Sequence, residues 1–147
     1  MNDTRQLIPI AGLVATFAIS AYMVTQLSGQ SAQATGDFRT AAVAEVHDGQ
    51  GQPLLRGEFM EIDDDDDDVE RTARLAPIGG DADASGAAEV EFAKATPARQ
   101  EIEFSVRNLG PGTMLSLLID GQTIGQVTVD QRGRATFETR ISGPASR

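Results

Sequence analysis

The sequence contains no cysteine and, among its 147 residues, a single histidine, His47. Without cysteine the fold has no disulfide, no thiolate metal ligand and no thiol nucleophile. One histidine cannot build a multi-histidine metal site, and it leaves a serine–histidine–acid arrangement with only one candidate base. These absences argue against an enzyme and predict no cofactor. We expect His47, which lies beside a turn, to be a polar surface residue.

Lysine and aromatic residues are also scarce: Lys94 is the only lysine beside 11 arginines, and tryptophan is absent. The net charge is −10, but eight of the 22 acidic residues lie in the segment 61–70. The other 14 nearly balance the 12 basic residues, so the acidity is local. No stretch of the sequence concentrates basic residues, and nucleic acid is therefore not expected as a partner.

The N-terminal segment predicts an export signal. Residues 7–24 carry no charge over a length close to that of a membrane-spanning helix, which we expect at about 7–27. The side chains expected to contact the membrane are Leu7, Ile8, Ile10, Leu13, Val14, Phe17, Ile19, Tyr22 and Val24.

Two fates of this segment are open. The length of the apolar stretch favours an uncleaved signal anchor, whereas the small residues of Ala32-Gln33-Ala34 favour cleavage after Ala34. Either fate places the rest of the chain outside the cytoplasm, in the periplasm or at the cell surface. We divide the chain into a signal anchor or signal peptide (1–34), a linker (35–40) and a β-domain (41–147).

Alternation of apolar and polar residues predicts that this domain is all-β. In 101–107, for example, Ile102, Phe104 and Val106 share one face and the charged residues share the other. Clusters of glycine, aspartate and proline separate such stretches. We expect an antiparallel sandwich or small barrel of about eight strands. The expected strands are 41–47, 54–62, 69–76, 87–93, 100–107, 113–119, 123–129 and 134–141.

Two Asp-Gly-Gln turns, Asp48-Gly49-Gln50 and Asp120-Gly121-Gln122, raise the hypothesis of an internal duplication. Each would lie in a three-stranded meander, with the 87–107 hairpin between the two meanders. In this arrangement the aspartate run Asp63–Asp68 occupies a hairpin tip, 61–70.

The segment 106–140 carries Leu109, Pro111-Gly112-Thr113, Asp120-Gly121, Asp130 and Gly133 in succession. This pattern resembles exported bacterial β-sandwich domains of uncharacterised function. The resemblance implies a β-fold and an extracytoplasmic location, and it implies no catalytic residue.

Three interpretations of the aspartate run are open: a docking surface for a basic partner, a calcium site, or a solvated loop that keeps the sheet soluble. Asp63, Asp65 and Asp67 alternate as calcium ligands can, but Asp68 and Arg74 stand where an EF-hand loop needs Gly and Glu. The candidate docking residues are Glu61, Asp63, Asp64, Asp65, Asp66, Asp67, Asp68 and Glu70.

Taken together, the sequence predicts a non-catalytic β-domain that is exported or tethered to the membrane. We expect it to act in protein interaction or structural support, for example as an accessory subunit of a membrane complex. Its expected partners are the membrane, through an uncleaved N-terminal helix, and a basic protein or membrane complex. The alternative is a calcium- or cation-binding protein that uses the Asp63–Asp68 loop.

Overall fold

The computed structural model describes residues 36–62, 67–79, 81–95 and 99–142. This part of the chain is all-β, as expected. Its strands are β1 (Val43–Asp48), β2 (Pro53–Ile62), β3 (Asp68–Pro77), β4 (Ser85–Ala93), β5 (Arg99–Arg107), β6 (Met114–Ile119), β7 (Gln122–Thr128) and β8 (Arg134–Ser142). Each begins and ends within two residues of its expected range. The strands therefore lie where the alternation of apolar and polar residues predicted them.

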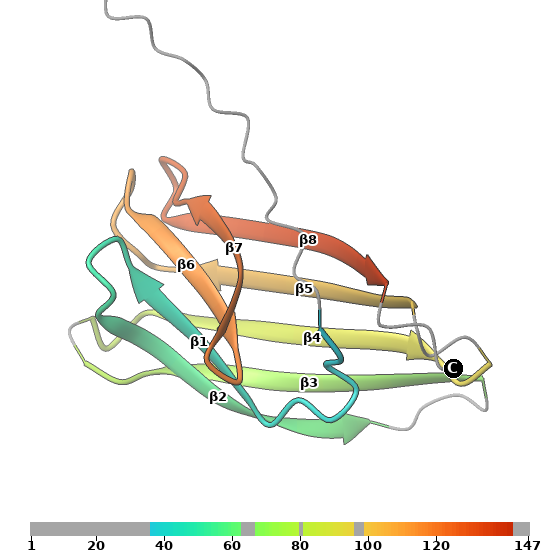
Figure 1. Cartoon of the computed structure of the whole chain (residues 1–147). Helices are drawn as coiled ribbons and strands as arrows, with labels where there is room; N and C mark the ends of the chain where they lie inside the picture. Colours follow the sequence, from blue (N-terminus) through green and yellow to red (C-terminus); the bar gives the residue numbers. More distant parts are fainter. Residues whose placement is uncertain (1–35, 63–66, 80, 96–98, 143–147) are drawn as a thin grey trace, which may run out of the picture.

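The eight strands form one antiparallel sheet in the order β7-β6-β1-β2-β3-β4-β5-β8. The sheet curls so that its two outermost strands, β7 and β8, approach each other without pairing (Figure 1). The architecture is thus a single, nearly closed, barrel-like sheet, which agrees with the expected all-β class.

The hypothesis of two three-stranded meanders is wrong for the second one. β8 pairs with β5 from Arg107↔Arg134 to Arg99↔Ser142, and β6 pairs with β1. The pairing with β5 lets the apolar face of β8 continue the row of buried residues on β5. β7 and β8 meet only near their connecting turn and then diverge (Figure 1).

The turns also show which segments are structurally equivalent. Asp48 and Asp130 each accept two backbone N–H groups, two and four residues later, at 2.8–2.9 Å, and each turn ends in a glycine with positive φ, Gly51 or Gly133. Asp120 instead has a φ of 48° and is followed by Gly121 at 78°, as in a two-residue hairpin turn. The repeated Asp-Gly-Gln letters therefore do not mark equivalent turns.

One end of the barrel is closed by residues 36–42. The ring of Phe38 is buried although it falls in the range expected to be a linker, and its backbone N–H donates to Gln100 Oε1 at 2.7 Å. The backbone N–H groups of Ala42 and Val43 donate to the Asp120 carboxylate at 2.8–3.2 Å. These contacts attach the start of the described chain to the barrel.

Candidate functional site

The most distinctive surface of the described domain is the outer face of β3, β4, β5 and β8. Alternation along these strands sends Ala, Val, Ile and Phe inward and charged residues outward. Six glutamates from the four strands gather on this face, and we call them the glutamate band: Glu70, Glu89, Glu91, Glu101, Glu103 and Glu138.

Strand register makes the glutamates of the band direct neighbours. The cross-strand pairs are Glu70 with Glu91, Glu91 with Glu101, Glu89 with Glu103, and Glu103 with Glu138. Side chains that lie opposite each other in an antiparallel pair are only about 5 Å apart at Cβ. Like charges in such positions destabilise the sheet, so the band has an energetic cost.

The electrostatic consequence is clearest at Glu89, which is partly buried in the middle of the band. Desolvation raises the pKa of Glu89 above its usual value, and the negative charges of Glu70, Glu103, Glu91 and Glu101 raise it further.

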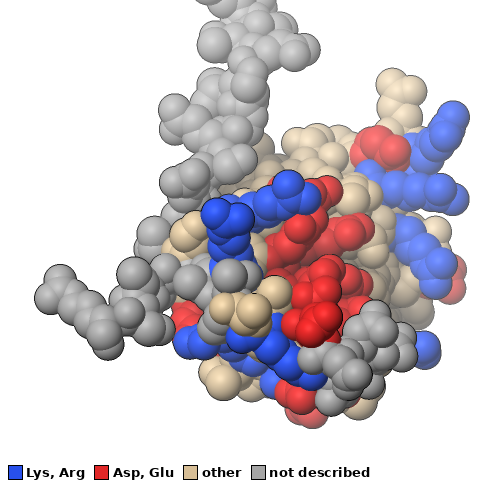
Figure 2. Space-filling view, turned by 90° about the vertical axis from the view of Figure 1, so that its right-hand side faces the viewer, with Lys and Arg blue, Asp and Glu red and all other residues tan. Residues whose placement is uncertain are grey.

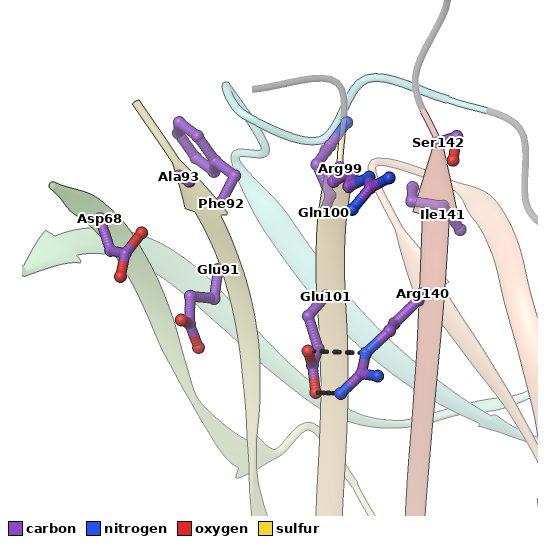
Figure 3. Close-up of a pocket in the computed structure, with 10 residues that line it drawn as sticks. All are labelled: Asp68, Glu91, Phe92, Ala93, Arg99, Gln100, Glu101, Arg140, Ile141 and Ser142. Atoms are coloured by element: carbon purple, nitrogen blue, oxygen red, sulfur yellow. Dashed lines mark hydrogen bonds and ion pairs between the residues drawn. The ribbon is translucent and has the colours of Figure 1, made fainter. Parts of the chain in front are cut away.

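The end of the band near Glu101 is compensated by one arginine. Arg140 donates from Nε to Glu101 Oε2 at 2.9 Å and from Nη2 to Oε1 at 3.3 Å, and these hydrogen bonds lower the pKa of Glu101. Arg140 Nη2 also lies 3.7 Å from Glu138 Oε1. The pair with Glu101 is the paired contact drawn in Figure 3.

Beside this pair lies an open hollow of about 500 Å³ at the end of the sheet where β4 and β8 finish. Glu91, Glu101 and Asp68 line it together with Arg99 and Arg140 (Figure 3). Viewed from this side of the molecule, acidic side chains form a continuous patch with basic side chains around it (Figure 2). The hollow thus offers charged groups to a large charged surface and no enclosed space for a small molecule.

Basic residues mark the opposite end of the same face. Arg107 lies opposite Arg134 across β5 and β8, and Arg74 lies opposite Ala87 across β3 and β4. One end of the outer face is therefore basic, whereas at the other end Arg99 and Arg140 lie among the acidic residues.

The aspartate run joins the glutamate band. β2 and β3 pair up to Ile62↔Glu70, so the run connects the two strands of a hairpin, as expected, although residues 63–66 lie outside the described part of the chain. Of the described candidates, Asp68 lines the hollow and Glu70 belongs to the band. Glu61 lies on the other side of the hairpin, with its Oε2 3.3 Å from Arg71 Nη1.

The calcium hypothesis finds no support among the described residues, where no group of three or more His, Cys, Asp or Glu side chains is arranged to hold a metal ion. Asp63 and Asp65 lie outside the described residues, and Asp67 uses its carbonyl to accept the backbone N–H of Lys94 at 2.8 Å.

His47 lies on the outer face of β1, opposite Ser116 of β6, with Nε2 3.5 Å from Glu45 Oε2. This places a carboxylate, an imidazole and a hydroxyl close together. However, the Ser116 hydroxyl accepts a hydrogen bond from Gln126 Nε2 at 3.3 Å, and none joins it to His47. A nucleophilic serine needs its base within hydrogen-bond reach, so this arrangement does not support catalysis.

The expected membrane contacts, from Leu7 to Val24, lie outside the described residues. Among the residues that are described, no helix has the length and apolar character needed to cross a membrane. No family model matches the chain, and neither the comparison with curated proteins nor that with solved structures gives a match.

Sequence reasoning placed Glu89, Glu91, Glu101 and Glu103 on solvated strand faces but did not recognise them as a site. The signal that was missed is register. Folding 87–93 back on 101–107 as a hairpin already places two of these glutamates opposite the other two. Glu70 and Glu138 join the band only because β3 and β8 flank that hairpin. The sequence does not show which strands flank it.

Proposed function

We propose that this domain is a non-catalytic interaction module that binds a basic segment or face of a partner protein through the glutamate band. The observation that carries the proposal is the set of four like-charge cross-strand pairs on one sheet face. Like charges that lie directly opposite each other destabilise a sheet, and Arg140 offsets this effect only at Glu101 and Glu138. A surface that only needed to be soluble would intersperse the two signs of charge, as the arginines on the same strands would allow.

The position of the aspartate run supports the same function. The run leads directly into Asp68 and Glu70, so it extends the negative potential of the band. A concentrated potential of one sign accelerates encounter with an opposite surface and weakens as salt is added. The domain would act outside the cytoplasm, tethered or released, as the N-terminal segment predicts.

A binding titration with an octa-arginine peptide at low ionic strength tests the proposal. The band variant replaces Glu89, Glu91 and Glu103 with glutamine. The matched control removes the same number of acidic charges away from the band: Glu58→Gln, Asp81→Asn and Asp83→Asn. Both variants have the same net charge, so a difference in their affinity for the peptide depends on where the removed charges lie.

We expect the band variant to bind the peptide at least about tenfold more weakly than the control, since each lost contact between opposite charges removes about 1 kcal/mol. Equal affinities of the band variant and the control would reject the band as the binding surface. A third variant, with Asp63–Asp68 replaced by alternating Ser and Gly, measures the contribution of the aspartate run.

A further inference from the structure

A second feature of the described barrel is the outer edge of β8, the strand that carries Glu138 of the glutamate band and the neighbouring Arg140. β8 is the last strand of the sheet and pairs only with β5 among the described strands. Its other edge is on the side of β7, which meets β8 near their connecting turn and then diverges from it (Figure 1). An unpaired strand edge presents backbone N–H and C=O groups that can accept another strand.

Hydrogen bonds at the start of β8 show which residues point to this edge. The Gly133 carbonyl accepts from Leu109 N on the β5 side at 3.2 Å, whereas the Arg134 backbone N–H and C=O bond to Asp130 on the other side. Backbone groups of successive residues alternate in direction along a strand. The residues whose backbone groups point to the free edge are therefore Thr136, Glu138, Arg140 and Ser142.

The sequence of the same segment is complementary to itself. About Thr139, the flanking residues are Glu138 and Arg140, then Phe137 and Ile141, then Thr136 and Ser142. In an antiparallel pairing of two copies centred on Thr139, each glutamate lies opposite an arginine and each hydroxyl lies opposite a hydroxyl. Phe137 and Ile141 also take opposite positions, on the face of β8 that packs against each chain's own core. If the two-fold axis lay at Arg140 or at Glu138 instead of Thr139, that residue would lie opposite its own copy, and two like charges would face each other.

We infer that the chain forms a homodimer in which β8 pairs antiparallel with β8 of a second copy, with the two-fold axis at Thr139. Glu138 and Arg140 are exposed, at 57% and 75% of their side chains, so both are accessible to a partner. Charges on an edge strand normally discourage pairing, and within the chain Arg140 already contacts Glu101 and Glu138. A second copy in this register adds a residue of opposite sign opposite each of Glu138 and Arg140. The uncharged edge of β7 (Gln122–Thr128) offers no such match.

Pairing in this register uses the backbone groups of β8 that point away from β5. The Glu138–Arg140 pairs fall at hydrogen-bonded positions and the Thr139 pair falls at a non-hydrogen-bonded position, where the two Cα atoms are about 4.5 Å apart. The two glutamate bands would then lie on one continuous sheet, separated by the two Arg140 side chains.

Charge reversal on the full-length chain in non-ionic detergent tests the inference by sedimentation velocity. Glu138→Arg alone and Arg140→Glu alone each create two like-charge pairs across the axis and should weaken dimerisation at least about tenfold. A mixture of the two variants should restore the dimer, because every pair between the two chains is then of opposite sign. The proposal is overturned if the wild-type chain stays monomeric. It is also overturned if the mixture of the two variants dimerises no more strongly than either variant alone.

The absence of native cysteine allows a second test that does not depend on charge. Thr139→Cys places one thiol on the axis, within the 4.4–6.8 Å Cα separation that a disulfide accepts. Thr136→Cys is the matched control, since it faces Ser142 of the partner and lies far from its own counterpart. Mild oxidation should give a covalent dimer with Thr139→Cys and none with the control. Failure of Thr139→Cys to cross-link, or equal cross-linking of both, contradicts this register.

Discussion

At the scale of single residues, Glu89 is the point where the cost of the acidic face is concentrated. It is partly buried, it lies opposite Glu103, and its pKa is raised first by desolvation and then by the surrounding carboxylates. A carboxyl group with a raised native pKa is a source of instability whenever it is charged. The fold therefore tolerates Glu89 at neutral pH and does not depend on it.

Replacing Glu89 with glutamine should stabilise the protein at pH 7 by up to about 1 kcal/mol, the size of one like-charge pair. As the pH falls through the raised native pKa, wild-type Glu89 takes up a proton in the folded state before it would in the unfolded state. Wild type then gains stability relative to the variant. The difference in unfolding free energy between the two proteins disappears below 4.5, the ordinary pKa of glutamate.

Thermal unfolding of both proteins between pH 4 and pH 7 measures this change, with Glu58→Gln as a control for the loss of one exposed carboxylate. A Glu89→Gln variant that is less stable than wild type at pH 7 would contradict the account of the band as an energetic cost.

Gln100 is the one buried polar residue of the described core, and it accepts the backbone N–H of Phe38. Gln100→Leu would leave that N–H buried without an acceptor, which costs about 1–3 kcal/mol. We expect a lower melting temperature and faster amide hydrogen exchange at Phe38. Gln126→Leu, on the exposed side of β7, is the control and should change stability by less.

At the scale of strands, Gly125 of β7 lies against the ring of Phe137 of β8. A Cβ added at Gly125 of β7 would lie 2.3 Å from Cζ of Phe137 on β8. The aromatic ring thus occupies the space that a side chain at Gly125 would need, and it fills the barrel where the two strands diverge.

Gly125→Ala should therefore destabilise the domain by about 1–3 kcal/mol, as forced overpacking does. Denaturant unfolding measures the change, and combining Gly125→Ala with Phe137→Leu should recover part of the loss. Gly49→Ala serves as the control, because its added Cβ would meet nothing closer than 3.9 Å. If both alanine variants are equally stable, the contact with Phe137 does not constrain the strands.

How far the sequence predicts this structure differs between the elements. Alternation located all eight strands, because each has one buried and one solvated face. It did not predict the pairing of β8 with β5, because nearness in sequence favours β7 and the alternation within a strand does not say which strand lies beside it. It also matched Asp48 with Asp120 by shared letters, although the backbone hydrogen bonds make Asp130 the equivalent residue.

At the scale of the whole molecule, the acidic residues are not spread over the surface. The run after Ile62 and the glutamate band adjoin through Asp68 and Glu70, while Arg107 and Arg134 stand together at the opposite end of the same face. The acidic residues thus form one patch that Arg99 and Arg140 border, and we expect associations through this patch to be sensitive to salt.

The location of the protein remains a prediction from residues 1–34. N-terminal sequencing of the protein from the membranes and the extracytoplasmic fraction of its host tests it. A membrane-bound chain that starts at Met1 indicates an anchor, and a soluble chain that starts near Thr35 indicates cleavage. Recovery of the chain in the cytoplasm alone would contradict both.

The most direct test of the central claim is a nuclear magnetic resonance titration of the isotope-labelled protein with octa-arginine. We predict that the largest amide shifts fall on β4, β5 and β8 around Glu91, Glu103 and Glu138, and that they disappear when salt is raised. Shifts spread evenly over the barrel, or centred on the Arg107–Arg134 end, would contradict the assignment of the glutamate band as the binding surface.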